Sequence, residues 1–145
     1  MLCREVMKSE PVCLRPDMSV QTAAQRMGDE NIGFVPVCDE QGRVLGALTD
    51  RDITLRAVAK ALPPSTKVSD VMTPEVVACR EDEDVERAEE RMRQAQKSRI
   101  MCTDAAGHLV GVISLSDIAE CRPGEQAAGT LRAVAGREAR ARRAG

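Results

Sequence analysis

Aromatic side chains are almost absent from this chain of 145 residues, which has no Trp, no Tyr and one Phe. Proteins that bind nucleic acid often stack bases on such rings, so the composition argues against nucleic acid as a partner. Histidine is equally scarce, because His108 is the only one, and no two of the six Cys form a CxxC motif. A zinc site would need at least three thiolates from scattered positions, so we expect no metal.

Long apolar runs are also lacking, and none approaches the roughly 20 residues that span a bilayer. The first residues, Met1 to Glu5, do not have the apolar stretch of a secretory signal. We therefore expect a cytoplasmic protein without membrane contact. No Cys/His or Ser/His constellation and no P-loop is recognisable, so we expect a protein that is not an enzyme.

The chain has a net charge of −2, but its charged residues are unevenly distributed. Residues 122–145 contain six Arg and two Glu, which leaves an acidic body and a basic C-terminal helix or tail. A basic tail can bind nucleic acid or an acidic partner, but we favour a solvated and partly frayed terminal helix.

The strongest positive signal is an internal repeat at an offset of 65 residues, with no gap. When Val6–Leu55 is placed on Val71–Glu120, fifteen of fifty positions are identical. A fixed period defines the structural unit. We expect repeat 1 over 1–62, a linker over 63–67, repeat 2 over 68–121 and the tail over 122–145.

Each repeat opens with Val-Met. The residue pattern that follows predicts the order strand, helix, strand, strand, helix, which indicates an α/β fold. Ser19 and Asp84 are suitable N-caps for the first helix. Its apolar face is expected to contain, in the two copies, Val20, Ala23, Ala24 and Met27, and Val85, Ala88, Met92 and Ala95. Extended segments are expected at 11–14, 34–38 and 44–48, and at 76–79, 100–102 and 109–113. A second helix is expected from Thr49 to about Leu62, and another from Ser114.

A polar motif, Gly-x-x-Thr/Ser-x-x-Asp, recurs where the last strand of each repeat meets the second helix. It reads Gly46…Thr49…Asp52 in the first copy and Gly111…Ser114…Asp117 in the second. A capping box explains the hydroxyl and the carboxylate without any ligand. However, Asp is shorter than the usual Glu or Gln, which would leave its carboxylate to accept from another donor. A carboxylate that accepts ribose hydroxyls beside a helix N-terminus that holds phosphate describes a nucleotide site.

Arginines lie close to both copies of this motif. Arg51 is inside the first copy, and Arg99 precedes a strand of the second. Either guanidinium could clamp a phosphate.

The order of the elements, with "IGFVPVCD" followed by "GRVLGALTDRDI", resembles the cystathionine β-synthase (CBS) domain. Two in tandem, from about Arg4 to Glu120, resemble a Bateman module, and a stand-alone pair is similar to the hypoxic response protein type. The resemblance implies a three-stranded sheet with two helices per repeat, pseudo-symmetric packing and a homodimer. It also implies an adenosine-containing ligand in clefts between the repeats: AMP, ADP or ATP first, with NAD or S-adenosylmethionine as other members of the class.

The resemblance also implies roles for individual residues. Asp52 and Asp117 would hold the ribose hydroxyls, and Thr49 and Ser114 the region between ribose and phosphate. The adenine pocket would be lined by residues near Val12, Cys13, Phe34, Val35, Pro36, Val77 and Ala78. Met101 and Leu115-Ser116 depart from the pattern of the first copy, so we expect the two sites to differ in affinity.

The cysteines allow two interpretations. They can be buried free thiols that behave as small apolar side chains, or Cys13 and Cys38 can form a redox-sensitive pair. Together these observations favour a regulatory module that senses nucleotide and signals to a separate, unknown protein effector. The alternative is a ligand-free interaction or scaffold module, with or without redox sensing through Cys13 and Cys38.

Overall fold

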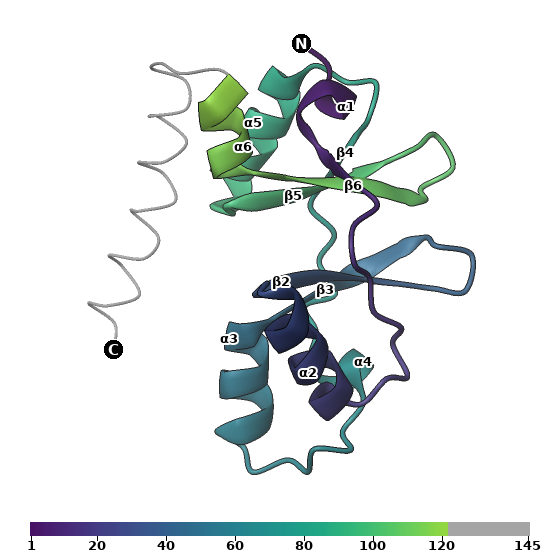
Figure 1. Cartoon of the computed structure of the whole chain (residues 1–145), viewed down its shortest axis with the longest axis vertical. Helices are drawn as coiled ribbons and strands as arrows, with labels where there is room; N and C mark the ends of the chain where they lie inside the picture. Colours follow the sequence, from purple (N-terminus) through teal and green to yellow (C-terminus); the bar gives the residue numbers. More distant parts are fainter. Residues whose placement is uncertain (122–145) are drawn as a thin grey trace. The chain divides into compact units, whose positions relative to one another are not determined.

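The structure is a computed structural model that describes residues 1–121, so the Arg-rich segment 122–145 lies outside the described residues. The described chain forms two compact units (Figure 1). Of the described residues, unit 1 contains Met1–Pro11, Val77–Ala106 and Val110–Cys121. Unit 2 contains Val12–Val76 and Gly107–Leu109. Both units combine helices with sheet, which confirms the predicted α/β class.

Unit 2 is built on an antiparallel hairpin of β2 (Phe34–Cys38) and β3 (Val44–Thr49). Phe34 pairs with Thr49, and Pro36 pairs with Ala47. Its helical elements are α2 (Val20–Glu30), α3 (Asp50–Asp52), the π-helix η1 (Ile53–Val58) and α4 (Val68–Val71). Figure 1 shows α2, α3 and α4 on the same side of the hairpin.

Unit 1 contains a four-stranded sheet in the order β1-β6-β5-β4. Its elements are α1 (Cys3–Val6), β1 (Lys8–Ser9), β4 (Ala78–Arg80), α5 (Val85–Ala95), β5 (Arg99–Thr103), β6 (Leu109–Ser114) and α6 (Leu115–Cys121). β4 runs parallel to β5, whereas the two-residue β1 pairs antiparallel with β6. The fourth strand exceeds the three expected per repeat because β1 comes from the start of the chain.

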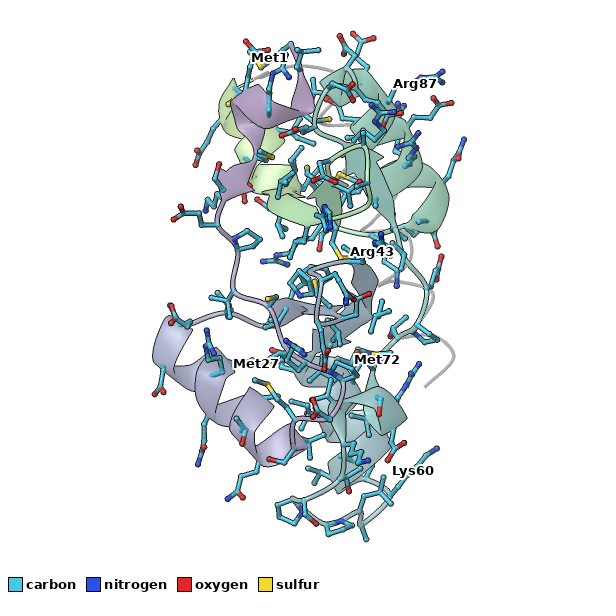
Figure 2. All side chains as sticks on the ribbon, turned by 90° about the vertical axis from the view of Figure 1, so that its right-hand side faces the viewer. Met1, Met27, Arg43, Lys60, Met72 and Arg87 are labelled. Carbon is cyan, nitrogen blue, oxygen red and sulfur yellow. The ribbon has the colours of Figure 1, made fainter. Side chains whose placement is uncertain are left out.

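The opening segments of the two repeats are exchanged between the units. Val6 packs in the core of unit 1 among residues of the second repeat. Val68 and Val71 are fully buried in the core of unit 2 among residues of the first repeat. Figure 2 shows Met27 on α2 and Met72 just after α4 in the same unit. Met27 belongs to this core, and Met72 packs against it. The segment that follows each Val-Met therefore lies beside a strand of the other repeat: Lys8 and Ser9 pair with β6, and Thr73 forms an antiparallel bridge with Ala47 of β3.

The long helices α2 and α5 form as their sequences predict. The Ser19 hydroxyl accepts the Thr22 N–H at 3.1 Å, and the Asp84 carboxylate accepts the Glu86 N–H at 3.0 Å. Both helices end at a left-handed residue, Asn31 in α2 and Gln96 in α5. The predicted faces are buried at Val20, Ala23 and Met27, and at Val85, Ala88 and Met92. Ala24 is exposed, so its place on the core face was predicted wrongly, and Ala95 is only partly buried.

Two other predictions need correction. The segment 11–14 forms no strand and pairs only through Leu14, which makes a parallel bridge to Val37. Pro11 has no N–H to donate to a ladder, which is consistent with the weaker pairing. The helix expected from Thr49 to Leu62 begins as predicted but becomes the π-helix η1, with bonds such as Ala59 N–H to Thr54 O at 2.9 Å. Propensity carries no signal for this change of hydrogen-bond register.

Candidate functional site

The carboxylate of Asp52 is held at the junction of β3 and α3 by a reciprocal capping box. The Asp52 N–H donates to Thr49 Oγ1 at 3.0 Å, and the Thr49 N–H donates to Asp52 Oδ2 at 3.0 Å. The argument that an Asp is too short to reach back is therefore wrong. The cap uses Oδ2, and Oδ1 takes no part in the cap.

The second copy of the motif has the same geometry at the junction of β6 and α6. The Asp117 N–H donates to Ser114 Oγ at 3.1 Å, and the Ser114 N–H donates to Asp117 Oδ2 at 2.8 Å. Asp117 is more enclosed than Asp52, since the whole residue is only 8% exposed. Again the cap engages Oδ2 and leaves Oδ1 to other donors.

Three further side chains reach these carboxylates. Thr73 Oγ1 lies 3.3 Å from Asp52 Oδ1 and 3.4 Å from Oδ2, and Arg56 Nε lies 3.8 Å from Oδ1. In unit 1, Lys8 Nζ lies 3.6 Å from Asp117 Oδ1. None of the three is among the site residues predicted from the sequence. The signal that could have found two of them is the repeat itself, because Lys8 and Thr73 occupy the same position after Val-Met.

The glycines of the motif leave room for the exchanged segments. A β-carbon on Gly46 would collide with the Thr73 carbonyl oxygen, a backbone atom. A β-carbon on Gly111 would meet the Met7 side chain, and the Lys8 carbonyl oxygen at 3.0 Å. Gly at these positions therefore lets the segment at position 73 or 8 run close beside the strand that ends in the hydroxyl residue.

The remaining predicted site residues of unit 2 lie along β2 and the segment before α2. Phe34 faces Thr49 across the hairpin, and the Leu14 N–H donates to the Pro36 carbonyl at 2.9 Å, which places Cys13 next to β2. Val12 packs partly buried against the core. Val35 is fully buried, so only its backbone is available to a ligand. Arg51 is exposed, and its N–H donates to Asp50.

In unit 1, the predicted residues lie on neighbouring strands. Ala78 pairs with Met101, and the Met101 N–H donates to the Val77 carbonyl at 3.2 Å. Arg99 is exposed at the start of β5, whose neighbour β6 ends at Ser114. The predicted set thus falls into two groups, one in each unit, and each contains one complete motif.

All six cysteines are free thiols in the structure. Burial, together with the neighbouring Cys13 thiol, raises the pKa of Cys38 to about 12. Cys13 itself is exposed, and its pairing with Cys38 stays a prediction.

A second cluster of thiols lies in unit 1. Cys79 Sγ is 3.5 Å from Cys102 Sγ, and this contact raises the pKa of Cys79 to about 12. A hydrogen bond with Cys79, together with burial, also raises the pKa of Cys3.

Among residues 1–121, no group of three or more His, Cys, Asp or Glu side chains is arranged to hold a metal ion. No helix in the same part is long and apolar enough to cross a bilayer.

Comparison with known proteins agrees with this geometry. The model of the CBS domain matches residues 3–58 and 68–124. The CBS domain-containing protein YhcV of Bacillus subtilis is 35% identical over 127 residues, which are 88% of this chain and 89% of YhcV. The predicted resemblance, including that to the hypoxic response protein, is confirmed.

Solved structures share the fold. Hypoxic Response Protein I, solved with two coordinated zinc ions, has a TM-score of 0.78 at 27% identity, and the match covers 85% of this chain and all of that one. The CBS domain pair of MJ0100, solved with 5′-methylthioadenosine and S-adenosyl-L-methionine, has a TM-score of 0.74 at 26% identity over 83% of this chain and 94% of that one. PAE2072 from Pyrobaculum aerophilum, complexed with AMP, shows the same fold with a TM-score of 0.75 at 24% identity, over 94% of this chain and 99% of that one.

Proposed function

We propose, from the premise that this chain belongs to the CBS domain family, that it is a regulatory module that binds an adenosine-containing ligand through Asp52 and Asp117. One observation carries this proposal. In both repeats the capping box occupies Oδ2 of the aspartate, while Oδ1 faces a side-chain donor or cation from the exchanged segment. A cap needs only one carboxylate oxygen. In both units the other oxygen, Oδ1, therefore lies where it can accept hydrogen bonds from a ligand.

Ribose is a good chemical match for such an oxygen. Its two neighbouring hydroxyls are donors, and a carboxylate oxygen has lone pairs for both. Thr49 and Ser114 add a hydroxyl beside each carboxylate, and Arg51 and Arg99 are exposed cations for phosphate. Phe34, opposite Thr49, offers an apolar surface for adenine. The adenosine compounds in the structures of MJ0100 and PAE2072 support this ligand class.

Regulation in this proposal works by population shift. A ligand that binds one arrangement of a protein more tightly than another increases the population of that arrangement. We propose that the arrangement is read by a separate effector protein and that the chain acts as a homodimer. Leu55, Val58 and Leu62 support a homodimer, because these large apolar side chains in and just after η1 are 47%, 70% and 41% exposed.

A titration calorimetry screen tests the function. The protein is stripped of nucleotide and titrated with AMP, ADP, ATP, NAD and S-adenosylmethionine. We expect saturable binding of at least one compound, with a matching rise in the midpoint of thermal unfolding. Flat titrations with a folded protein would contradict the proposal and favour the ligand-free scaffold, in which the motifs are caps only.

A further inference from the structure

Lys8 and Thr73 occupy the same position in the two repeats, one residue after Val-Met, and each reaches the aspartate of its own unit. Thr73 brings a neutral hydroxyl to Asp52 Oδ1 at 3.3 Å. Lys8 brings an ammonium group to Asp117 Oδ1 at 3.6 Å. The repeat thus places a different chemical group at one geometric position.

The backbone of Lys8 is fixed, whereas its side chain is not. Lys8 pairs with Val112 in the β1–β6 ladder, and its carbonyl lies close to Gly111 of the motif. Its side chain is 81% exposed, while that of Asp117 is only 11% exposed. The ammonium itself is exposed to solvent and its 3.6 Å separation from Asp117 Oδ1 is longer than a hydrogen bond, so it can leave the carboxylate at small cost. Lysine also has a flexible stem and three donors, which allows it to turn to another anion.

The cation near Asp52 is held differently. Arg56 approaches Asp52 Oδ1 at 3.8 Å, but its NH1 also donates to the Met72 carbonyl at 3.1 Å. That guanidinium therefore ties η1 to the chain that follows α4. Thr73, which stands at the place of Lys8, carries no charge.

We propose that Lys8 is a ligand-contacting residue that sets the specificity of the Asp117 site for anionic adenosine nucleotides over uncharged adenosine. This inference rests on the proposed function. The ribose hydroxyls replace Lys8 at Asp117 Oδ1, and the released ammonium then bonds to the phosphate. Without Lys8, the carboxylate would face the phosphate with no neighbouring ammonium, and like charges repel.

The test uses the full chain with Asp52→Asn, a near-isosteric change that retains an acceptor for the cap and leaves Asp117 as the intact site. AMP and adenosine are titrated into this protein and into its Lys8→Thr and Lys8→Arg versions. We expect Lys8→Thr to weaken AMP about tenfold and to leave adenosine unchanged or tighter, because a competitor for Oδ1 is gone. Lys8→Arg should retain the preference for AMP. Arg87→Thr removes an equal charge from an exposed position of α5 in unit 1 and should change neither ligand.

The reciprocal change strengthens the test. Thr73→Lys, in a chain with Asp117→Asn, should raise the preference of the Asp52 site for AMP over adenosine. Equal changes for AMP and adenosine in Lys8→Thr, or no change in either, would overturn the role of Lys8 while leaving the proposed function intact. If the unmodified chain bound no nucleotide at all, the proposed function and this inference would both fail.

Discussion

The carbonyl oxygen of Thr73 lies against Gly46, in the space that a β-carbon would fill. The Ala47 N–H donates to the same carbonyl at 3.0 Å, so this oxygen is fixed by the backbone and cannot move aside. The glycine of the motif is therefore required by the chain that crosses it, and this chain carries the hydroxyl that reaches Asp52.

Gly46→Ala should lower the free energy of unfolding by about 3 kcal/mol, because overpacking against backbone forces a main-chain shift. Urea denaturation measures the change. Gly28→Ala is the matched control: Gly28 lies inside α2 with no atom within 4 Å of a new β-carbon, and alanine there should add about 0.5–1 kcal/mol. Gly111→Ala should cost less than Gly46→Ala, since its nearest neighbour is the flexible Met7 side chain. Equal effects at positions 28 and 46 would contradict the account.

Glu83 should stabilise unit 1 in a way that acid removes. Arg91 binds its carboxylate with two hydrogen bonds, of 2.7 and 2.8 Å, and holds the pKa of Glu83 below its usual value of 4.5. The stabilisation is present above pH 4.5 and is lost as the pH falls through the lowered pKa. Glu83→Gln should cost about 1 kcal/mol at pH 7, since the pair is partly exposed, and much less at pH 3.

The control for this prediction is Glu90→Gln, which removes an exposed partner of Arg87 at 3.8 Å. Chemical denaturation at both pH values should show almost no loss for this variant. A loss for Glu83→Gln that is the same at pH 7 and pH 3 would refute the role of the ion pair.

In the folded protein, the two exposed cysteines should react faster with a thiol reagent than the four buried ones. Cys13 and Cys121 are exposed, whereas the pKa values of Cys3, Cys38 and Cys79 are raised. A raised pKa keeps a thiol protonated, and the thiolate is the reactive form. At pH 8, a disulfide reagent should therefore react quickly with two thiols, and with all six after denaturation.

Oxidation tests the predicted pair. If Cys13 and Cys38 form a disulfide, mild oxidant should lower the total thiol count by two, and Cys13→Ser should prevent this loss. An unchanged count would remove redox sensing through this pair.

The exposed apolar side chains along and after η1 should mediate self-association. Val58→Glu places a charge at the most exposed of the three, at 70% exposure, and should turn a dimer into a monomer without loss of stability. Analytical ultracentrifugation measures the mass. Gln25→Glu, the same change in charge on an exposed position of α2, should leave the dimer intact. A monomeric parent protein, or a Val58→Glu dimer, would refute this interface.

The parts of the fold that could be predicted are those that depend on local sequence patterns and occur in both repeats. Apolar periodicity located α2 and α5. The caps at Ser19 and Asp84 could be predicted because capping depends on a few adjacent residues. The capping boxes at Thr49 and Ser114 could be predicted for the same reason. The π-helix η1 was not, because nothing in the segment after Asp52 distinguishes one hydrogen-bond register from the other.

The site was predictable only in part, because part of it comes from a distant segment. Asp52 and Asp117 stood out as a repeated motif, but Thr73 and Lys8 reach them only through the exchange of the opening segments. That exchange depends on which core buries Val6 and which buries Val71, and this is decided by tertiary packing rather than by the local sequence. Likewise, the contact of Cys79 with Cys102 requires the parallel register of β4 and β5.

The most direct test of the central claim compares AMP with 2′,3′-dideoxy-AMP, which lacks both ribose hydroxyls. Each is titrated calorimetrically into the nucleotide-stripped parent chain, Asp52→Asn and Asp117→Asn. The account predicts that the parent binds AMP at least about tenfold more tightly than the dideoxy compound, since the dideoxy compound makes no hydrogen bond to the charged carboxylate. This difference should disappear at the site whose aspartate is replaced. Equal affinities of the parent for both compounds, or Asn variants that still discriminate fully at both sites, would contradict ribose recognition by Asp52 and Asp117.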